Sequence, residues 1–287
     1  MDASPLSVAS ASALPWTLLG LGWAAGALLM LVLWALSRRH RDAGVVDVGW
    51  AALLGALAVM LAWTGDGHPT QRLLIGTLGG LWGLRLATHL LFDRVLGKPE
   101  DGRYRALRQH WGPRADVHFL WFFQVQALLA VVLSLPFALA AGNPSPRLAL
   151  LQWCGLALFV GAKLGETVAD RQLARFRADP HNRGRTCRRG PWRWSRHPNY
   201  FCEWLVWCAF ALLALPAPHG AWALLAPALM YLMVTRVSGI PWTEAQALRS
   251  RGDDYRRYQA ETNAFFPGPP RRSAPDTRPP TPQELPS

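Results

Sequence analysis

Ionisable and amide side chains lie inside long apolar stretches of this 287-residue chain, where such groups are costly and usually functional. They are Asp47, Arg85, His89, Gln124, Gln126, Lys163, Glu166 and Glu203. If each stretch is a helix that rises about 1.5 Å per residue, nearly all of these side chains lie in the same third of a bilayer. We expect them to line a polar cavity open to the cytosol. Pairing within the protein is the alternative, as for Lys163 and Glu166 at helical i,i+3 spacing.

The segment that precedes the apolar stretch Tyr200–Pro216 is rich in arginine. Its arginines include Arg177, Arg183, Arg185, Arg188, Arg189, Arg193 and Arg196. The guanidinium fork matches the oxygen geometry of a phosphate group. Pro198 favours the start of a helix at that point, and the N–H groups at a helix start also bind phosphate. The segment therefore predicts a site for a phosphate-bearing ligand.

Seven apolar stretches must position these side chains. They are Leu14–Leu36, Val45–Trp63, Arg72–Phe92, Phe119–Ala141, Leu148–Val168, Tyr200–Pro216 and Ala221–Val237. Each approaches the roughly 20 residues that a helix needs to cross a bilayer. Most of the 30 Lys and Arg residues lie in alternate loops and in the C-terminal tail, whereas the turns on the opposite side hold Arg72 and Arg147. The predicted fold class is all-α, a bundle of about seven transmembrane helices with the N-terminus outside and the C-terminus cytoplasmic.

Length and composition indicate one membrane-embedded domain. We expect an N-terminal segment over residues 1–13, a transmembrane domain over 14–266 and a disordered Pro- and Arg-rich tail over 267–287. The net charge of +12 is explained by topology and by attraction to anionic lipid, so we predict no nucleic-acid partner. The four cysteines have no metal-like spacing, so we predict no metal. Abundant Ala, Leu, Gly and Arg favour a bacterial source and hence the inner membrane, and the oligomeric state stays open.

Two motifs occupy the last third of the chain. The first is Arg196-His197-Pro198-Asn199-Tyr200 with Glu203, and the second is Ser238-Gly239-Ile240-Pro241 followed by Tyr255, Tyr258, Phe265 and Pro267. Together they resemble bacterial membrane proteins related to steroid 5α-reductase, over about residues 45–267. The resemblance implies a seven-helix fold and NADPH bound in a cytosol-facing pocket. It also implies reduction of a carbon–carbon double bond conjugated to a carbonyl, in a steroid-like or other lipid substrate that enters from the bilayer.

The resemblance assigns cofactor contacts to eight positions of this chain. They are Glu166, Asp170, Arg177, Arg185, His197, Asn199, Arg236 and Glu244. Glu166 replaces the usual Asn of the steroid enzymes, and Glu244 replaces a Tyr. The arginines, Asp170 and Asn199 keep the expected residue type, so the cytosolic half of the site matches better than the membrane half.

The substrate side departs from the family. A conjugate reductase needs a donor near the substrate carbonyl oxygen, because an enolate forms there as hydride arrives at the β carbon. In the steroid enzymes a Glu and a Tyr supply it, but here Trp82 stands where the Tyr would be, and an indole cannot deliver a proton. Asp47 is the nearest acidic candidate, and His89 and Tyr104 are further possible donors. A structural pairing of Asp47 with Arg85 or His89 is the alternative.

Two other functions stay open. Membrane methyltransferases of the isoprenylcysteine carboxyl type also have an Arg-His-Pro motif and a later Glu before a Tyr-x-x-Tyr helix, and they bind S-adenosylmethionine. Those enzymes usually show two adjacent glutamates, whereas Glu244 is followed by Ala245. A non-catalytic lipid-binding protein is the other possibility. We favour the reductase, because the Ser-Gly-Ile-Pro turn and the many arginines suit a dinucleotide.

Overall fold

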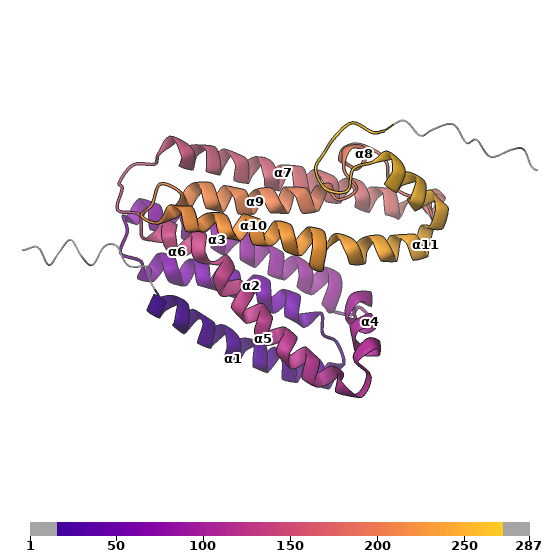
Figure 1. Cartoon of the computed structure of the whole chain (residues 1–287), viewed down its shortest axis with the longest axis horizontal. Coiled ribbons are helices and arrows are strands. Elements are labelled where there is room, and N and C mark those ends of the chain that lie inside the picture. The colour runs from indigo at the N-terminus through magenta and orange to yellow at the C-terminus, as the bar shows by residue number, and fades with distance from the viewer. Residues whose placement is uncertain (1–15, 272–287) are drawn as a thin grey trace, which may run out of the picture. The chain divides into compact units, whose positions relative to one another are not determined.

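A computed structural model of the chain describes residues 16–271 (Figure 1). Over this range the chain forms helices joined by turns, and no strand occurs. The predicted all-α class is therefore confirmed for the described residues. The predicted N-terminal segment 1–13 lies outside that range, as do the first two residues of the first predicted span and residues 272–287 of the predicted tail.

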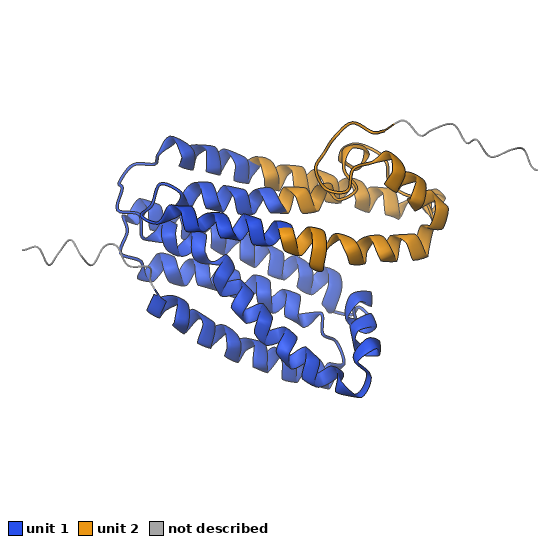
Figure 2. Ribbon diagram, in the orientation of Figure 1, with its two compact units in different colours: residues 1–160, 204–231 blue, residues 161–203, 232–287 orange. Residues whose placement is uncertain are grey.

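The chain divides into two compact units (Figure 2). Unit 1 comprises residues 1–160 and 204–231, and unit 2 comprises residues 161–203 and 232–287. Two helices, α7 (Leu150–Ala178) and α9 (Pro198–Ala214), contribute residues to both units. All eight positions predicted to contact a cofactor belong to unit 2, whereas the two predicted substrate-side residues, Asp47 and Trp82, belong to unit 1.

Unit 1 is a bundle of mostly apolar helices. Besides its parts of α7 and α9, it contains α1 (Trp16–His40), α2 (Val45–Thr64), α3 (Pro69–Leu90), the π-turn η3 (Leu91–Val95), α4 (Gly102–Trp111), η4 (Gly112–Arg114), α5 (Ala115–Leu133), α6 (Leu135–Ala141), η6 (Gly220–Leu224) and most of α10 (Leu225–Leu232). α2 packs along α3, and α5 packs along α1 (Figure 1). The chain turns between α5 and α6 at Ser134, and Pro136 fits the first turn of α6.

Glycines allow α2 and α3 to approach each other closely. A Cβ atom added to Gly83 would lie 2.5 Å from the Cα atom of Gly55 and 2.9 Å from the carbonyl oxygen of Ala51. A Cβ atom added to Gly79 would lie 2.5 Å from the methyl group of Ala58. Small residues at these positions therefore set the distance between the two helices, as they commonly do in membrane bundles.

The core of unit 1 is aromatic. Trp207, Phe210 and Phe137 are fully buried, and Trp82 is 2% exposed. The ring of Trp82 meets that of Trp207 edge-on with centroids 5.2 Å apart, and it meets Phe210 in the same way at 6.0 Å. Such contacts contribute about 0.5–1.5 kcal/mol each beyond burial. Trp82 therefore packs as a core residue of this unit.

Unit 2 is built from the adjoining parts of α7 and α9, several short helical turns and one bent helix. Besides its parts of α7 and α9, it contains η5 (Pro180–Asn182), α8 (Pro191–Trp194), the π-turn η7 (Met233–Val237) and α11 (Ile240–Glu261). α11 bends at Gly252, whose φ of 50° and ψ of −124° form a conformation that glycine adopts far more readily than other residues. The indole of Trp192 donates a hydrogen bond to the carbonyl oxygen of Ala169 over 2.9 Å. This bond holds α8 against α7.

Four helical segments are long and apolar enough to span a membrane. They are Trp16–His40, Val45–Thr64, Gly102–Ala141 and Gly220–Glu261. These segments indicate that the chain is a membrane protein. The other three predicted spans are helical as well, in α3, α7 and α9, but α9 has only 17 residues and α7 carries charged side chains along its second half. Seven spans and the orientation of the termini therefore stay predictions.

Replacement of Gly83 by alanine tests the close contact between α2 and α3. The added methyl group would overlap the backbone of Gly55, and overpacking of this kind costs about 1–3 kcal/mol. We expect a lower midpoint of thermal unfolding for the detergent-solubilised Gly83→Ala variant. Gly20→Ala in α1 is the matched control, because its Cβ atom would meet nothing within 4 Å. Equal midpoints for Gly83→Ala and the wild type would contradict the contact.

Candidate functional site

The carboxylate of Glu244, in the first turns of α11, is the centre of a polar network in unit 2. The Nε atom of Arg196 donates to its Oε1 atom over 2.6 Å, and the Nε2 atom of His197 lies 3.2 Å from the same oxygen. Gln259, beyond the bend in α11, donates to Oε2 over 2.8 Å. One carboxylate thus joins the start of α9 to both halves of α11.

Burial and hydrogen bonding set the charges in this network, which lies outside the predicted spans. His197 is 3% exposed, and burial lowers the pKa of its imidazole despite the neighbouring carboxylate. The ring is therefore neutral at pH 7, and its Nε2 atom carries the hydrogen because a carboxylate only accepts. Burial alone would raise the pKa of Glu244, but the hydrogen bonds from His197 and Arg196 outweigh burial and lower that pKa to about 2. Glu244 is therefore ionised.

Arg196 also binds the end of α11. Its Nη1 atom donates to the carbonyl oxygens of Gln259 over 3.0 Å and Thr262 over 2.5 Å. The side chain is only 12% exposed. Arg196 was among the arginines considered for phosphate, but the structure uses it to hold α9 and α11 together.

Arg188 makes a second attachment to α11. Its guanidinium donates to Glu261 over 2.9 Å and to Asp254 over 3.2 Å, and Asp254 also accepts from the backbone N–H of Thr186 over 2.7 Å. Asp254 lies two residues beyond the bend at Gly252, so the bend places these carboxylates beside the loop. Sequence reasoning missed this attachment, because a glycine within a highly charged segment does not by itself distinguish a bend from a turn or a helix end.

One face of α7 carries a row of polar side chains. Lys163, Glu166, Asp170 and Arg177 are separated by three, four and seven residues, which places them on the same side of the helix. Lys163 forms an ion pair with Glu166, and its Nζ atom lies 3.6 Å from a carboxylate oxygen of Glu203 on α9. The Lys163–Glu166 pairing considered from the sequence is thus present.

Asn199 continues this row from the first turn of α9. Its Nδ2 atom donates to Asp170 over 3.1 Å, and its Oδ1 atom accepts from the backbone N–H of Tyr200 over 3.0 Å. The structure therefore brings together Asp170 and Asn199, which the sequence predicted as two cofactor contacts. Glu166 lies one helical turn from Asp170 on the same face.

Three other predicted cofactor residues present their guanidinium groups at the surface. Arg177, Arg185 and Arg236 are exposed, and their side chains make no hydrogen bond or ion pair within residues 16–271. Burial lowers the pKa of Arg251, and the nearby charge of Arg177 lowers it further. Arg177 and Arg251 are therefore neighbouring cations, and clustered cations favour the binding of an anion.

Asp47, the predicted substrate-facing acid, is hydrogen-bonded within unit 1. Its Oδ1 atom accepts from the phenol of Tyr104 over 2.7 Å, and its Oδ2 atom accepts from Arg103 over 2.6 Å. The partners differ from Arg85 and His89, the two considered from the sequence. Both carboxylate oxygens are engaged in this arrangement, and Tyr104 is itself 1% exposed.

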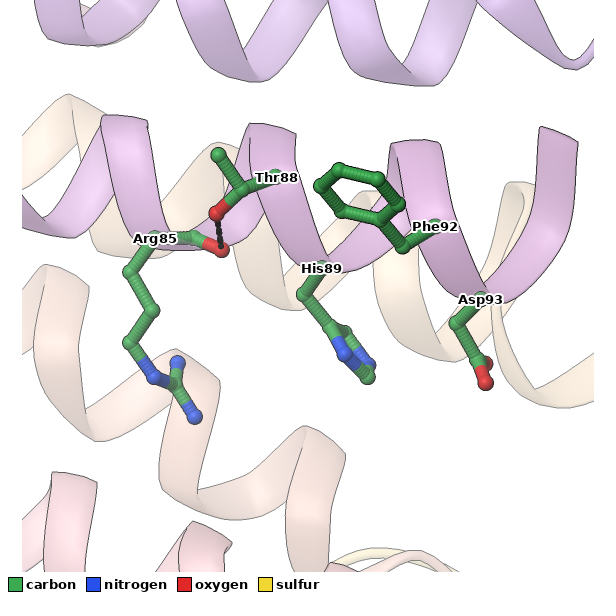
Figure 3. Close-up of a pocket in the computed structure, with 5 residues that line it drawn as sticks. All are labelled: Arg85, Thr88, His89, Phe92 and Asp93. Atoms are coloured by element: carbon green, nitrogen blue, oxygen red, sulfur yellow. Dashed lines mark hydrogen bonds between the residues drawn. The ribbon is translucent and has the colours of Figure 1, made fainter. Parts of the chain in front are cut away.

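A pocket of about 520 Å³ lies along α3 and η3 (Figure 3). Its lining residues are Arg85, Thr88, His89, Phe92 and Asp93. Arg85, His89 and Asp93 follow one another at intervals of four residues, and their side chains project to the same side of the helix (Figure 3). The pocket is a wide, open depression on the helix surface and not an enclosed cavity.

Comparison with known families matches residues 33–262 to the family described as "Protein of unknown function (DUF1295)". The match covers most of the chain and every predicted site residue. The chain belongs to the DUF1295 family. The DUF1295 family is related to the steroid 5α-reductase-like proteins, so the resemblance is confirmed as a relationship between families. A bacterial source stays a prediction.

One curated relative of this DUF1295 protein comes from the fission yeast Schizosaccharomyces pombe. It is the uncharacterized protein C594.04c, which is 28% identical over 264 residues that cover 82% of this chain and 76% of that protein. No solved structure matches the chain. The similarity therefore extends across both units.

Removal of the Glu244 charge tests the network around it. Glu244→Gln keeps the side-chain volume but leaves Arg196 without its counter-charge, and the loss of one partner from a mostly buried ion pair costs about 3 kcal/mol or more. We expect a clearly lower thermal midpoint in detergent. Asp253→Asn is the control, because its ion pair with Arg256 is exposed and should contribute less than about 1 kcal/mol. A similar small effect in both variants would argue against a central role for Glu244.

The pKa shifts predict sensitivity to acid. The pKa of His197 lies below the ordinary value of 6.5, so the unfolded chain binds a proton that the folded chain does not, and stability falls as the pH drops below about 6.5. The lowered pKa of Glu244 adds a second loss between its ordinary value of 4.5 and about 2. Thermal midpoints measured between pH 8 and pH 4 should show the first loss in the wild type and a smaller one in His197→Gln. Identical pH profiles would disprove the assignment to His197.

Proposed function

We propose that this protein is an NADPH-dependent membrane reductase that acts on a carbon–carbon double bond conjugated to a carbonyl in a lipid. The observation that carries the proposal is that the arginines of unit 2 include both carboxylate-bound and exposed side chains. Arg188 and Arg196 are bound by carboxylates, whereas Arg177, Arg185 and Arg236 present exposed guanidinium groups. Free guanidinium groups suit the phosphates of a dinucleotide.

The two kinds of polar residue in unit 2 fit the two kinds of polar group in NADPH. The three exposed arginines would hold phosphate groups. Asp170 and Asn199 carry oxygen acceptors and an amide, which suit ribose hydroxyls and a carboxamide. Glu166 and Arg177 are 11 residues apart on one face of α7, so about 16 Å of helix separates the acidic part of this row from its cationic end. An elongated ligand with both kinds of group is therefore favoured over a small anion.

His197 and Glu244 position the site in this proposal. Glu244 binds both His197 and Arg196, so the pair fixes the start of α9, where Asn199 follows two residues after His197. When bound, NADPH would supply hydride to the β carbon of the conjugated double bond. The apolar helices of unit 1 would contact lipid, which is consistent with an apolar substrate from the bilayer.

A methyltransferase is the second candidate, and one contact favours it. Arg196 and His197 both bind Glu244, so the Arg-His-Pro motif meets the later glutamate in space. These are the two features shared with methyltransferases of the isoprenylcysteine carboxyl type. The separate acidic and cationic parts of unit 2 favour the dinucleotide over S-adenosylmethionine, which carries no phosphate.

Titration of the detergent-solubilised protein with NADPH tests the proposal. Energy transfer from tryptophan to the nicotinamide should saturate. Arg177→Gln and Arg185→Gln should each weaken binding about tenfold or more, because a charge-assisted hydrogen bond contributes about 1.5–3 kcal/mol. Asn199→Ala should weaken binding as well. Arg114→Gln is the matched control, an exposed arginine of unit 1, and should bind NADPH as the wild type does.

The outcomes separate the candidate functions. Saturable binding of S-adenosylmethionine alone would assign the protein to the methyltransferases. Binding of neither ligand would favour a non-catalytic lipid-binding role. If the arginine and asparagine variants bind NADPH as tightly as the wild type, the assignment of the site is disproved, whereas the assignment of NADPH as the cofactor is not.

We also propose that the chain crosses the bacterial inner membrane seven times, with the N-terminus outside and the C-terminus in the cytoplasm. Charge distribution supports this arrangement, since the predicted outer turns hold Arg72 and Arg147 whereas the predicted inner loops hold most of the cations. In a variant without the native cysteines, Arg147→Cys should react with an impermeant maleimide on intact cells. Ser250→Cys should react only after permeabilisation, and the reverse pattern would disprove the orientation.

A further inference from the structure

The pocket along α3 and η3 has a polar side that could bind an oxygen atom. Arg85, His89 and Asp93 form a row on one side of the helix (Figure 3), and successive members lie about 6 Å apart along the axis. Arg85 and His89 at one end offer N–H donors, whereas Asp93 at the other end is an acceptor. A single acceptor group of a ligand therefore fits best beside Arg85 and His89.

The charges of the row favour a neutral ligand. Arg85 and Asp93 carry opposite charges, so they nearly cancel over the length of the pocket. A phosphate or sulfate group at Arg85 would bring further negative charge to the side of the pocket that holds Asp93, two helical turns away, and like charges repel each other. An uncharged carbonyl oxygen accepts hydrogen bonds from the same donors without that repulsion.

Apolar side chains adjoin this row on the same helix. Leu81 and Leu84 are each 61% exposed, and Phe92, which lines the pocket, is 67% exposed. Leu81 precedes Arg85 by four residues, so it lies one turn away on the same face. The combination of a few polar groups with apolar neighbours is typical of sites for apolar small molecules.

The backbone at this pocket is irregular. The α-helix α3 ends at Leu90, and the next five residues, Leu91–Val95, form the π-turn η3. Single π-turns within helices are rare and are frequently found at functional sites. η3 carries Phe92 and Asp93, so the irregular turn determines how both side chains meet the pocket.

The other substrate-side candidates of unit 1 are less suited to a ligand. Asp47 is bound by Tyr104 and Arg103 through both carboxylate oxygens, and Trp82 is 2% exposed in the aromatic core. Arg85 and His89 are both exposed at the open pocket, and a guanidinium has five N–H donors, so Arg85 can donate to a ligand in addition to its partner within the protein.

We propose that this pocket binds the carbonyl end of an uncharged apolar molecule, with Arg85 and His89 donating hydrogen bonds to the carbonyl oxygen. Leu81, Leu84 and Phe92 contact the apolar part of the ligand. The assignment of this molecule as the reductase substrate rests on the proposed function. Binding itself does not need the cofactor.

Photo-crosslinking of the full-length protein in detergent, without NADPH, tests the proposal. The probe is a long-chain α,β-unsaturated ketone with a diazirine next to the carbonyl, compared with the matching hydrocarbon, carboxylic acid and phosphate monoester. We expect the ketone to label peptides of residues 81–96 most strongly. Arg85→Leu and His89→Leu should each reduce that labelling at least tenfold, and Arg85→Lys should restore part of it. Arg114→Leu and His110→Leu, two exposed residues elsewhere in unit 1, should label as the wild type.

Each outcome decides the question. His89→Leu keeps the test valid even if Arg85→Leu fails to fold, because His89 has no hydrogen bond or ion pair within residues 16–271. Stronger labelling by the acid or the phosphate would overturn the ligand class. Labelling by the ketone outside residues 81–96, or unchanged in both leucine variants, would overturn the site. A separate NADPH titration of the same variants shows whether the proposed cofactor site fails independently.

Discussion

The charge of one carboxylate holds the predicted cofactor-binding unit together. Glu244 accepts hydrogen bonds from Arg196, His197 and Gln259, and Arg196 then reaches two carbonyl oxygens at the end of α11. Burial keeps the imidazole of His197 neutral, and the hydrogen bonds from His197 and Arg196 keep Glu244 ionised. If Glu244 were protonated and neutral, the mostly buried guanidinium of Arg196 would have no counter-charge, which is strongly destabilising. The position of Asn199, which donates a hydrogen bond to Asp170 on α7, follows from this network.

Much of the fold could be predicted from the sequence because apolar stretches of span length form helices. The start of α9 at Pro198 was also predictable, since proline fits the first turn of a helix. The bend at Gly252 was not, because a glycine in a charged segment is compatible with a turn, a helix end or an ordinary helix. The π-turns η3 and η7 could not be predicted either, since an extra residue in one turn leaves no signal in hydrophobic periodicity.

The candidate site was predictable by residue type but not by partner. The motif identified Arg196, His197 and Glu244, yet their mutual contacts join positions 47 and 48 residues apart, and spacing along the chain contains no information about such pairs. Asp47 shows the same limit, since it binds Tyr104 and Arg103, which belong to a different helix, in place of the residues at similar predicted depth. Arginine content alone also failed to separate Arg188 and Arg196, which hold α11, from the exposed arginines available to a ligand.

The proposed function assigns different ligands to the two units, which accounts for the different polar residues in each. Unit 1 combines a close-packed apolar core with an open pocket along α3 and η3, which suits an apolar molecule with a single polar end. Unit 2 combines a rigid ion-pair network with exposed cations, which suits a phosphate-bearing cofactor. The most direct test is hydrogen–deuterium exchange of the detergent-solubilised protein with and without NADPH. The account predicts slower exchange of the backbone amides of residues 170–178, 195–203 and 240–261 when NADPH is present. Unchanged exchange in these segments with NADPH, or slower exchange only with S-adenosylmethionine, would contradict it.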